Sequence, residues 1–277
     1  MENLELPLTS AEQRQKNLEA LEKLRPLDDT FMREMFRNDL ELAQYMLRII
    51  LSKPDLILTK EETQYDMQHL FGSRSITLDV FGVDSAGKQY DCEVQKADDG
   101  ANPKRARYHS AAMDVDNLKV REDFKHLPDT YVIFFTENDI FKKGKPIYRI
   151  ERIILDSDEP FDDGEHILYI NGAYCDESDT SDLAKLIHDF RCSKSSDMLL
   201  NLFAGKTRFL KETQEGVERM CKVMEERVKD NERRLLIKIA ADLLRLGNDT
   251  KEQIAEITGL SLETVNEIET NLNNISA

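Results

Sequence analysis

The sequence has little cysteine and no cysteine spacing that would suit a metal. Its 277 residues include four cysteines, none of them in a CxxC pair. This scatter argues against a disulfide framework and against a zinc ribbon, and favours a reducing compartment. The five histidines show no HExxH spacing, so they give no support for zinc either.

Long apolar runs and glycine-rich phosphate loops are also missing. No apolar stretch approaches the roughly 18 residues that a membrane span needs. The first residues, MENLELPLTSAEQRQKN, lack the basic flank and apolar core of a secretory signal. Neither GxxxxGKS/T nor GxGxxG occurs, so no nucleotide cofactor is expected. We therefore expect a cytoplasmic protein without a membrane span.

Positive charge is scarce for a nucleic-acid-binding protein, because phosphate binding needs local positive charge. The formal net charge is −16. Residues 1–150 carry 22 basic and 27 acidic side chains, a net of −5, whereas residues 151–277 carry 16 and 27, a net of −11. A DNA site is therefore expected in the first part of the chain.

The pattern of apolar residues predicts an α/β protein with a mixed sheet. Helices are expected at residues 10–24, in one helix or a helix pair up to Pro54, at 101–120, and over most of 181–246. Strands are expected at residues 55–65, 130–138, 147–156 and 166–174, besides a hairpin at 76–95. We assign an N-terminal helical segment to residues 1–24, an α/β domain to 25–180 and a helical C-terminal region to 181–277.

The hairpin ITLDVFGVDSAGKQYDCEVQK places two acids within pairing distance. If residues 85–87 form a three-residue loop with Gly87 in the left-handed conformation, the numbers of paired residues sum to 172. Asp79 then lies directly opposite Glu93, with Cα atoms roughly 4.5–5.5 Å apart. Like charges in that arrangement repel, but two carboxylates together bind a hard cation such as Mg²⁺.

Strand alternation divides this hairpin into a core face and a solvated face. The expected core face carries Ile76, Leu78, Val80, Tyr90, Cys92 and Val94, and the solvated face carries Thr77, Asp79, Phe81, Asp91, Glu93 and Gln95. Spacing alone leaves two interpretations open: a cation site, or an amphipathic hairpin whose solvated face is merely acidic.

Three motifs in order resemble the PD-(D/E)XK nuclease superfamily. DDTFMREMF, then the hairpin, then KRARYHSA are similar to its recombination-promoting nuclease and transposase families, over residues 24–155. The resemblance implies a restriction-endonuclease-like mixed β-sheet core flanked by helices, with an α-helical C-terminal region. It also implies a Mg²⁺-dependent DNA endonuclease linked to recombination or mobile elements, with Mn²⁺ as a substitute ion.

Carried over position by position, the resemblance makes Asp79 and Glu93 metal ligands, with the Val94 carbonyl as an additional one. Gln95 stands where the superfamily has a catalytic lysine. An amide can orient water or phosphate by hydrogen bonds, but it brings no charge. Lys96 does not replace that lysine, because strand alternation sends it to the opposite face.

Outside the hairpin, the resemblance singles out three more residues. Asp29 corresponds to an acidic residue near the first helix of the family and would add a carboxylate at the metal site. The alternative interpretation is that Asp28 or Asp29 only caps that helix. Arg105 and Tyr108, three residues apart on one helix face, would bind the scissile phosphate or hold the carboxylates; alternatively, they belong to a solvated face.

The C-terminal part has helix-turn-helix spacing around Gly259, in residues 250–269. A DNA-reading helix needs basic or amide side chains at its N-terminal end, yet residues 248–277 hold one basic residue, Lys251, against six acidic ones. We interpret this part as a packing or protein-contact element. The helix over residues 212–246, expected to break near Asp230-Asn231, is assigned a packing role on the core or on a partner helix.

Three functions follow from these patterns together with the resemblance. In the first, an intracellular DNA endonuclease, a water activated at the Asp79/Glu93 metal site attacks the phosphodiester while Gln95 positions it. In the second, motivated by Gln95 and the net charge, the nuclease fold is catalytically inactive and the helical tail mediates association, including homo-oligomers. The third, a transcriptional regulator acting through residues 250–270, is disfavoured by its acidic second helix.

Overall fold

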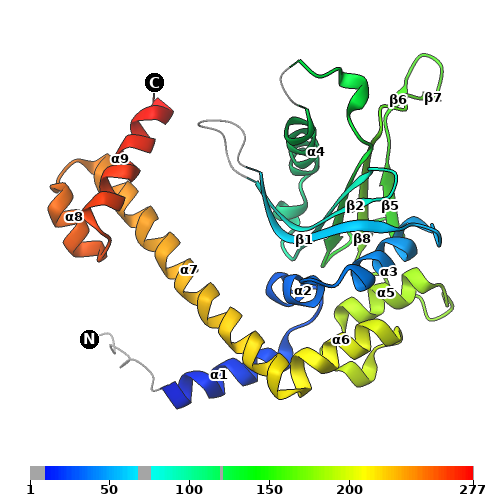
Figure 1. Cartoon of the computed structure of the whole chain (residues 1–277), viewed down its shortest axis with the longest axis horizontal. Coiled ribbons are helices and arrows are strands. Elements are labelled where there is room, and N and C mark those ends of the chain that lie inside the picture. Colours follow the sequence, from blue (N-terminus) through cyan, green and yellow to red (C-terminus); the bar gives the residue numbers. More distant parts are fainter. Residues whose placement is uncertain (1–9, 68–75, 119–120, 277) are drawn as a thin grey trace. The chain divides into compact units, whose positions relative to one another are not determined.

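A six-stranded mixed sheet, in the order β1-β2-β3-β4-β8-β5, organises the first part of the chain (Figure 1). Its strands are β1 (Leu58–Met67), β2 (Ile76–Asp84), β3 (Gln89–Gln95), β4 (Thr130–Thr136), β5 (Ile147–Ile150) and β8 (Glu165–Asn171). The first three strands are antiparallel, β3, β4 and β8 run parallel, and β5 is antiparallel to β8. This arrangement confirms the predicted α/β class with a mixed sheet.

The computed structural model describes residues 10–67, 76–118 and 121–276. The described residues fall into two units, the first ending at Cys221 and the second beginning at Lys222. The predicted N-terminal segment up to residue 9 and the predicted helix end at 119–120 lie outside the described residues. The domain boundaries placed at residues 24 and 180 stay a prediction.

Helices cover both faces of the sheet. On one face lie α2 (Asp29–Phe36) and α3 (Leu40–Leu51), and on the other lies α4 (Pro103–Asn117) (Figure 1). All seven residues of β4 are buried, as its uninterrupted apolar sequence predicts. Met113 of α4 packs with Phe134 of β4 and Tyr169 of β8 in the apolar cluster on the α4 side.

Local signals explain where these helices begin. The expected helix up to Pro54 is a pair, because Asn38 adopts a positive φ of 55° between α2 and α3. The Asp39 side chain then caps α3 by accepting a hydrogen bond from the Leu42 N–H at 3.1 Å. Asn102 caps α4 in the same way, accepting from the Lys104 N–H at 2.8 Å. Pro103 occupies the first helical position, where its missing N–H costs nothing.

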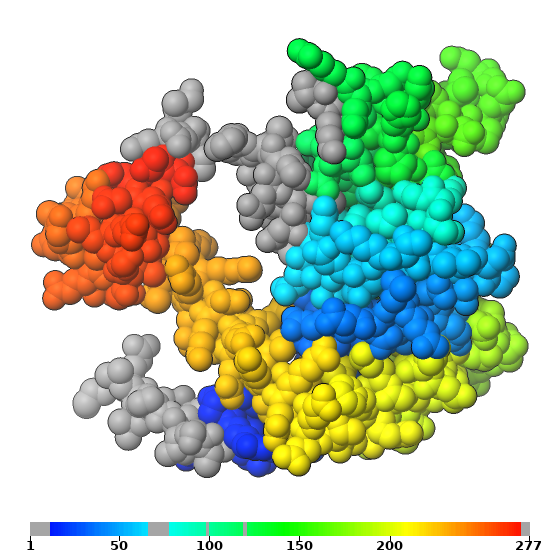
Figure 2. Space-filling view, viewed as in Figure 1, coloured from blue at the N-terminus to red at the C-terminus, as the bar shows by residue number. Residues whose placement is uncertain are grey.

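The remaining described elements are mostly helical. They are α1 (Ser10–Lys23), α5 (Asp182–Arg191), α6 (Asn201–Glu212), α7 (Gln214–Leu246), α8 (Lys251–Thr258) and α9 (Leu262–Ser276), with short 3₁₀ turns at Asp98–Ala101, Phe124–His126 and Ser195–Asp197. A two-stranded ribbon of β6 (Ile153–Ile154) and β7 (Glu159–Pro160) projects at the edge of the first unit, light green in Figure 2. None of the helices that the structure describes has the length and apolar character to cross a bilayer.

The predicted break near Asp230-Asn231 is wrong, because α7 runs through it without interruption. Neither residue is glycine or proline, and each costs at most about 0.7 kcal/mol in a helix interior relative to alanine. In the second unit, Ala240 of α7 packs with Ile254 of α8 and Val265 of α9. This small core joins the helix-turn-helix-like end to the last turns of α7.

Candidate active site

The β2–β3 hairpin adopts the predicted register. Val80 pairs with Cys92 and Phe81 with Asp91, so each pair of numbers sums to 172. Gly87 takes the left-handed conformation with φ of 82°, as the three-residue loop requires. One residue beyond the Val80–Cys92 pair, the Asp79 backbone N–H donates a hydrogen bond to Glu93 Oε1 at 3.0 Å. The two acids therefore occupy neighbouring positions across the two strands.

The predicted solvated face of this hairpin is wrong. Asp79 is 4 % exposed, Asp91 0 % and Glu93 1 %. Leu78 and Phe81, which were expected on opposite faces, share the apolar cluster next to α4. The alternation of one hairpin cannot reveal that helices pack on both of its faces, which is what buries these carboxylates.

Glu93 is held by two of the predicted site residues. The Arg105 Nη2 group donates to Glu93 Oε2 at 3.0 Å, and the Gln95 amide Nε2 donates to the same oxygen at 3.3 Å. Arg105 Nη1 also donates to Gln95 Oε1 at 3.1 Å. The structure thus brings Glu93, Gln95 and Arg105 into one hydrogen-bonded group.

Asp79 has a different partner, Arg33 of α2. Arg33 Nε and Nη2 donate to Asp79 Oδ1 at 3.0 and 2.5 Å. Arg33 Nε also lies 2.7 Å from Asp29 Oδ1, so one guanidinium links two of the predicted metal ligands. Sequence reasoning missed Arg33, although its position four residues after Asp29 on a helix face was a usable signal.

Of the two residues considered as caps of the first helix, only Asp28 lies at the cap position. Asp28 occupies the N-cap position of α2 without a capping side-chain hydrogen bond. Its carboxylate accepts from the Arg25 backbone N–H at 2.6 Å and forms an ion pair with Lys96. Lys96 is therefore directed to Asp28.

Two further residues complete the cluster around Glu93, and sequence reasoning did not assign them to the site. One donor atom each from Asp91, Glu93 and His109 lies within 4.8 Å of the others, and all three residues are buried. His109 Nδ1 is 2.8 Å from Asp91 Oδ2 and 4.0 Å from Glu93 Oε1. The available signals were the two-residue spacing of Asp91 and Glu93 on one strand face and the four-residue spacing of Arg105 and His109 on α4.

Burial dominates the electrostatics of the three acids. It raises the pKa of Glu93 well above its ordinary value, and the neighbouring carboxylates of Asp91 and Asp79 raise it further. Burial likewise raises the pKa of Asp91 well above its ordinary value, and it raises that of Asp79 against the opposing effect of Arg33. Because three buried carboxylates face two guanidinium groups, a further positive charge would stabilise the ionised site.

The donor set fits a divalent cation. Carboxylate oxygens are the ligands that Mg²⁺ and Mn²⁺ prefer. Asp91 Oδ1 is a buried oxygen without a hydrogen-bond partner among the described residues. Tyr108, the last of the predicted site residues, is 43 % exposed on α4.

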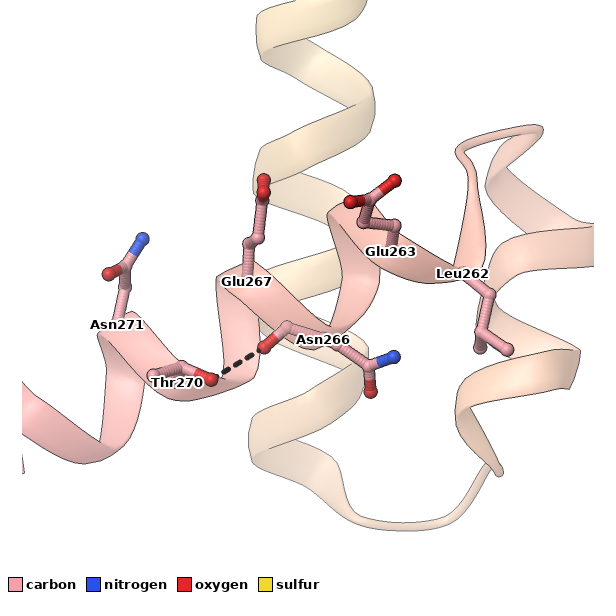
Figure 3. Close-up of a pocket in the computed structure, with 6 residues that line it drawn as sticks. All are labelled: Leu262, Glu263, Asn266, Glu267, Thr270 and Asn271. Carbon is pink, nitrogen blue, oxygen red and sulfur yellow. Dashed lines mark hydrogen bonds between the residues drawn. The ribbon is translucent and has the colours of Figure 1, made fainter.

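The helix-turn-helix-like end offers a contrasting chemistry. The face of α9 lines a surface pocket with Leu262, Glu263, Asn266, Glu267, Thr270 and Asn271 (Figure 3). Among the described residues that line it, two are acids and none is basic, and the Thr270 hydroxyl donates to the Asn266 carbonyl at 2.9 Å. Such a surface repels phosphate, which disfavours DNA reading by this part of the chain, and its packing role stays a prediction.

Comparison with known proteins adds one finding. A family model described as PD-(D/E)XK nuclease family transposase matches residues 41–256, which is more than half of the chain. Neither the curated proteins nor the solved structures contain a significant match. The matched range contains the hairpin and α4, whereas Asp29 and Arg33 of α2 precede it.

Proposed function

The chain belongs to the PD-(D/E)XK nuclease family of transposases, and we propose that it is a divalent-metal-dependent DNA endonuclease. The observation that supports this best is the group of buried carboxylates from β2 and β3, with Arg105 and Gln95 hydrogen-bonded to Glu93. Burying several acids together is costly unless a positive charge compensates them. A bound cation would supply the positive charge that compensates these acids.

Asp79 and Glu93 would hold Mg²⁺, or Mn²⁺ in its place, and Asp29 would add a carboxylate at the edge of the site. Such an ion, when bound, lowers the pKa of water and offsets charge on the phosphate. Arg33, which donates to Asp79, would keep that carboxylate oriented, and its charge opposes the rise that burial causes in the pKa of Asp79.

The other side chains would orient the reactants. Gln95 has an amide that already donates to Glu93 Oε2, so a water beside Glu93 lies within its reach. Arg105 supplies the positive charge that Gln95 lacks, and with Tyr108 on the same helix it would bind the scissile phosphate. We assign the activity to cytoplasmic DNA transactions of the recombination or mobile-element type.

Nicking of supercoiled plasmid by the Glu93→Gln variant tests this proposal. Glutamine keeps the shape but loses the charge, so we expect a loss of about 10³-fold or more in Mg²⁺. Asp156→Asn, which changes an exposed acid of the same unit, is the matched control and should nick like the wild type. Nicking by Glu93→Gln at the wild-type rate would refute the proposal.

A second role, association through the helical tail, has its own observation. Val228, Leu235, Ile239 and Leu246 of α7 are 49, 58, 38 and 67 % exposed. Spacings of seven, four and seven residues place them along one side of the helix. We propose that this side mediates homo-oligomers. Sedimentation of Leu235→Glu should then show a smaller species than the wild type, and equal sedimentation would contradict it.

A further inference from the structure

A hydrogen-bonded chain runs from Asp91 through His109 to Arg105. Asp91 Oδ2 lies 2.8 Å from His109 Nδ1, and Arg105 Nε donates to His109 Nε2 at 3.2 Å. Asp91 and His109 are 0 % and 3 % exposed, so this part of the chain is shielded from water. From Arg105 it continues to Glu93 and Gln95, the two residues at the centre of the proposed site.

The direction of these hydrogen bonds fixes the imidazole. An arginine side chain only donates, so His109 Nε2 must be the unprotonated acceptor. The proton of a neutral imidazole then resides on Nδ1, where it is donated to Asp91 Oδ2. Asp91 thereby sets the tautomer and the ring orientation of His109, as carboxylates commonly do for functional imidazoles.

This arrangement adds a restraint on Arg105 to its hydrogen bonds with Glu93 and Gln95. Its side chain is 40 % exposed, and a partly solvated arginine loses considerable rotamer entropy when it is ordered. His109, four residues later on α4, holds the Nε edge of the guanidinium. With that edge fixed, Nη2 meets Glu93 and Nη1 meets Gln95.

We propose that Asp91 and His109 are positioning residues that hold Arg105 against Glu93 and Gln95. They place a guanidinium charge beside the amide that stands where the superfamily has a lysine. The expected effect on catalysis rests on the proposed nuclease function. The tautomer of His109 and the restraint on Arg105 do not depend on that function.

His109→Phe tests the proposal in the full-length protein. Phenylalanine keeps a ring beside Phe134, whose centroid is 5.9 Å from that of His109, but removes both nitrogens. Because misplacing a group by about 1 Å can cost 10²-fold, we expect kcat for plasmid nicking to fall about 10–100-fold, with KM within about twofold. His109→Gln, whose amide both donates and accepts, should recover part of that loss.

A double-mutant cycle separates positioning from general damage. If His109 acts through Arg105, His109→Phe should have no further effect on kcat in an Arg105→Ala background. The matched control is His166→Phe. That histidine also contacts a carboxylate, Glu151, at 2.9 Å and stacks on Tyr131, but it takes no part in the chain. It should leave kcat unchanged.

Three kinetic or binding results would overturn the proposal. They are an unchanged kcat in His109→Phe, losses that multiply in the Arg105→Ala background, or a tenfold loss of Mn²⁺ affinity in His109→Phe by calorimetry. The last would identify His109 as a metal ligand instead. If the wild type itself nicks no DNA, the nuclease proposal fails. The positioning role of Asp91 and His109 is then tested separately, by ¹⁵N NMR of the intact protein. A His109 ring protonated at Nδ1 alone supports it, and one protonated at Nε2 overturns it.

Discussion

The guanidinium of Arg33 lies between Asp79 and Asp29, with Nε 3.0 Å from Asp79 Oδ1 and 2.7 Å from Asp29 Oδ1. Both acids are proposed to face a metal ion. Arg33 therefore supplies, from α2, a positive charge at the place where a cation would bind. A metal ion bound by these two acids would therefore compete with this guanidinium for the same carboxylate oxygens.

Replacing Arg33 by glutamine should make the protein more dependent on metal. Without metal, the variant should lose about 3 kcal/mol of stability, because the buried Asp79 carboxylate loses its charged partner. The rise in Tm on adding Mn²⁺ should exceed that of the wild type. Thermal unfolding with and without Mn²⁺ measures both, and Arg208→Gln, at a 60 % exposed side chain, is the control. A Mn²⁺-induced shift no larger than that of the wild type would contradict the competition.

Gly100 offers a way to move the Gln95 amide without changing it. A Cβ atom at Gly100 would collide with Gln95 Oε1 and lie 3.2 Å from its Cδ. The end of a flexible side chain can turn away, so Gly100→Ala should fold normally. It should nevertheless lower kcat about tenfold, because the amide leaves Arg105 and Glu93.

The control for this change is Gly205→Ala, at an exposed position in α6 with no atom within 4 Å of the added Cβ. It should keep full activity and stabilise the protein by roughly 0.5–1 kcal/mol, since alanine suits a helix interior better than glycine. Equal kcat values for Gly100→Ala and Gly205→Ala would show that the position of the Gln95 amide does not matter.

Glu61 on β1 should make stability depend on pH. Burial raises the pKa of Glu61 from 4.5 to about 7, and its Oε1 has no hydrogen-bond partner among the described residues. The folded state therefore binds this proton more tightly than the unfolded state, and stability falls as pH rises between 4.5 and about 7. Glu61→Gln removes the cost of ionisation. It should raise Tm at pH 8 by on the order of 2 °C, because water screens this half-buried group, and have little effect at pH 4.5.

The neighbouring Glu62→Gln is the matched control for that measurement. Glu62 is exposed and forms an ion pair with Lys60 at 3.0 Å, so its replacement should give no gain at pH 8. A Tm gain of Glu61→Gln that is the same at both pH values would contradict the assignment.

Local chemistry explains which parts of the fold the sequence predicts well. The turn at Gly87 sets the hairpin register, and the Asn102-Pro103 pair sets the start of α4. The buried strand Thr130–Thr136 is recognisable because an unbroken apolar run suits a strand covered on both faces. Each of these signals lies within a few residues of the structure that it determines.

The contacts that build the site are of a different kind. Arg33 and Asp79 are 46 residues apart in the chain, and Asp91 and His109 are 18 apart. Periodicity within one element cannot show that α2 and α4 dock on opposite faces of the hairpin. For this reason the sequence predicts Glu93 as a site residue, but it does not predict the burial of the neighbouring acids or their partners.

The most direct test of the nuclease assignment is the nicking of supercoiled plasmid by the wild type and by Asp79→Ala, in Mg²⁺ and in EDTA. We predict that the wild type nicks the plasmid in Mg²⁺ but not in EDTA, and that Asp79→Ala nicks it under neither condition. The variant should nevertheless unfold cooperatively like the wild type. Retained Mg²⁺-dependent nicking by a folded Asp79→Ala protein would contradict the account.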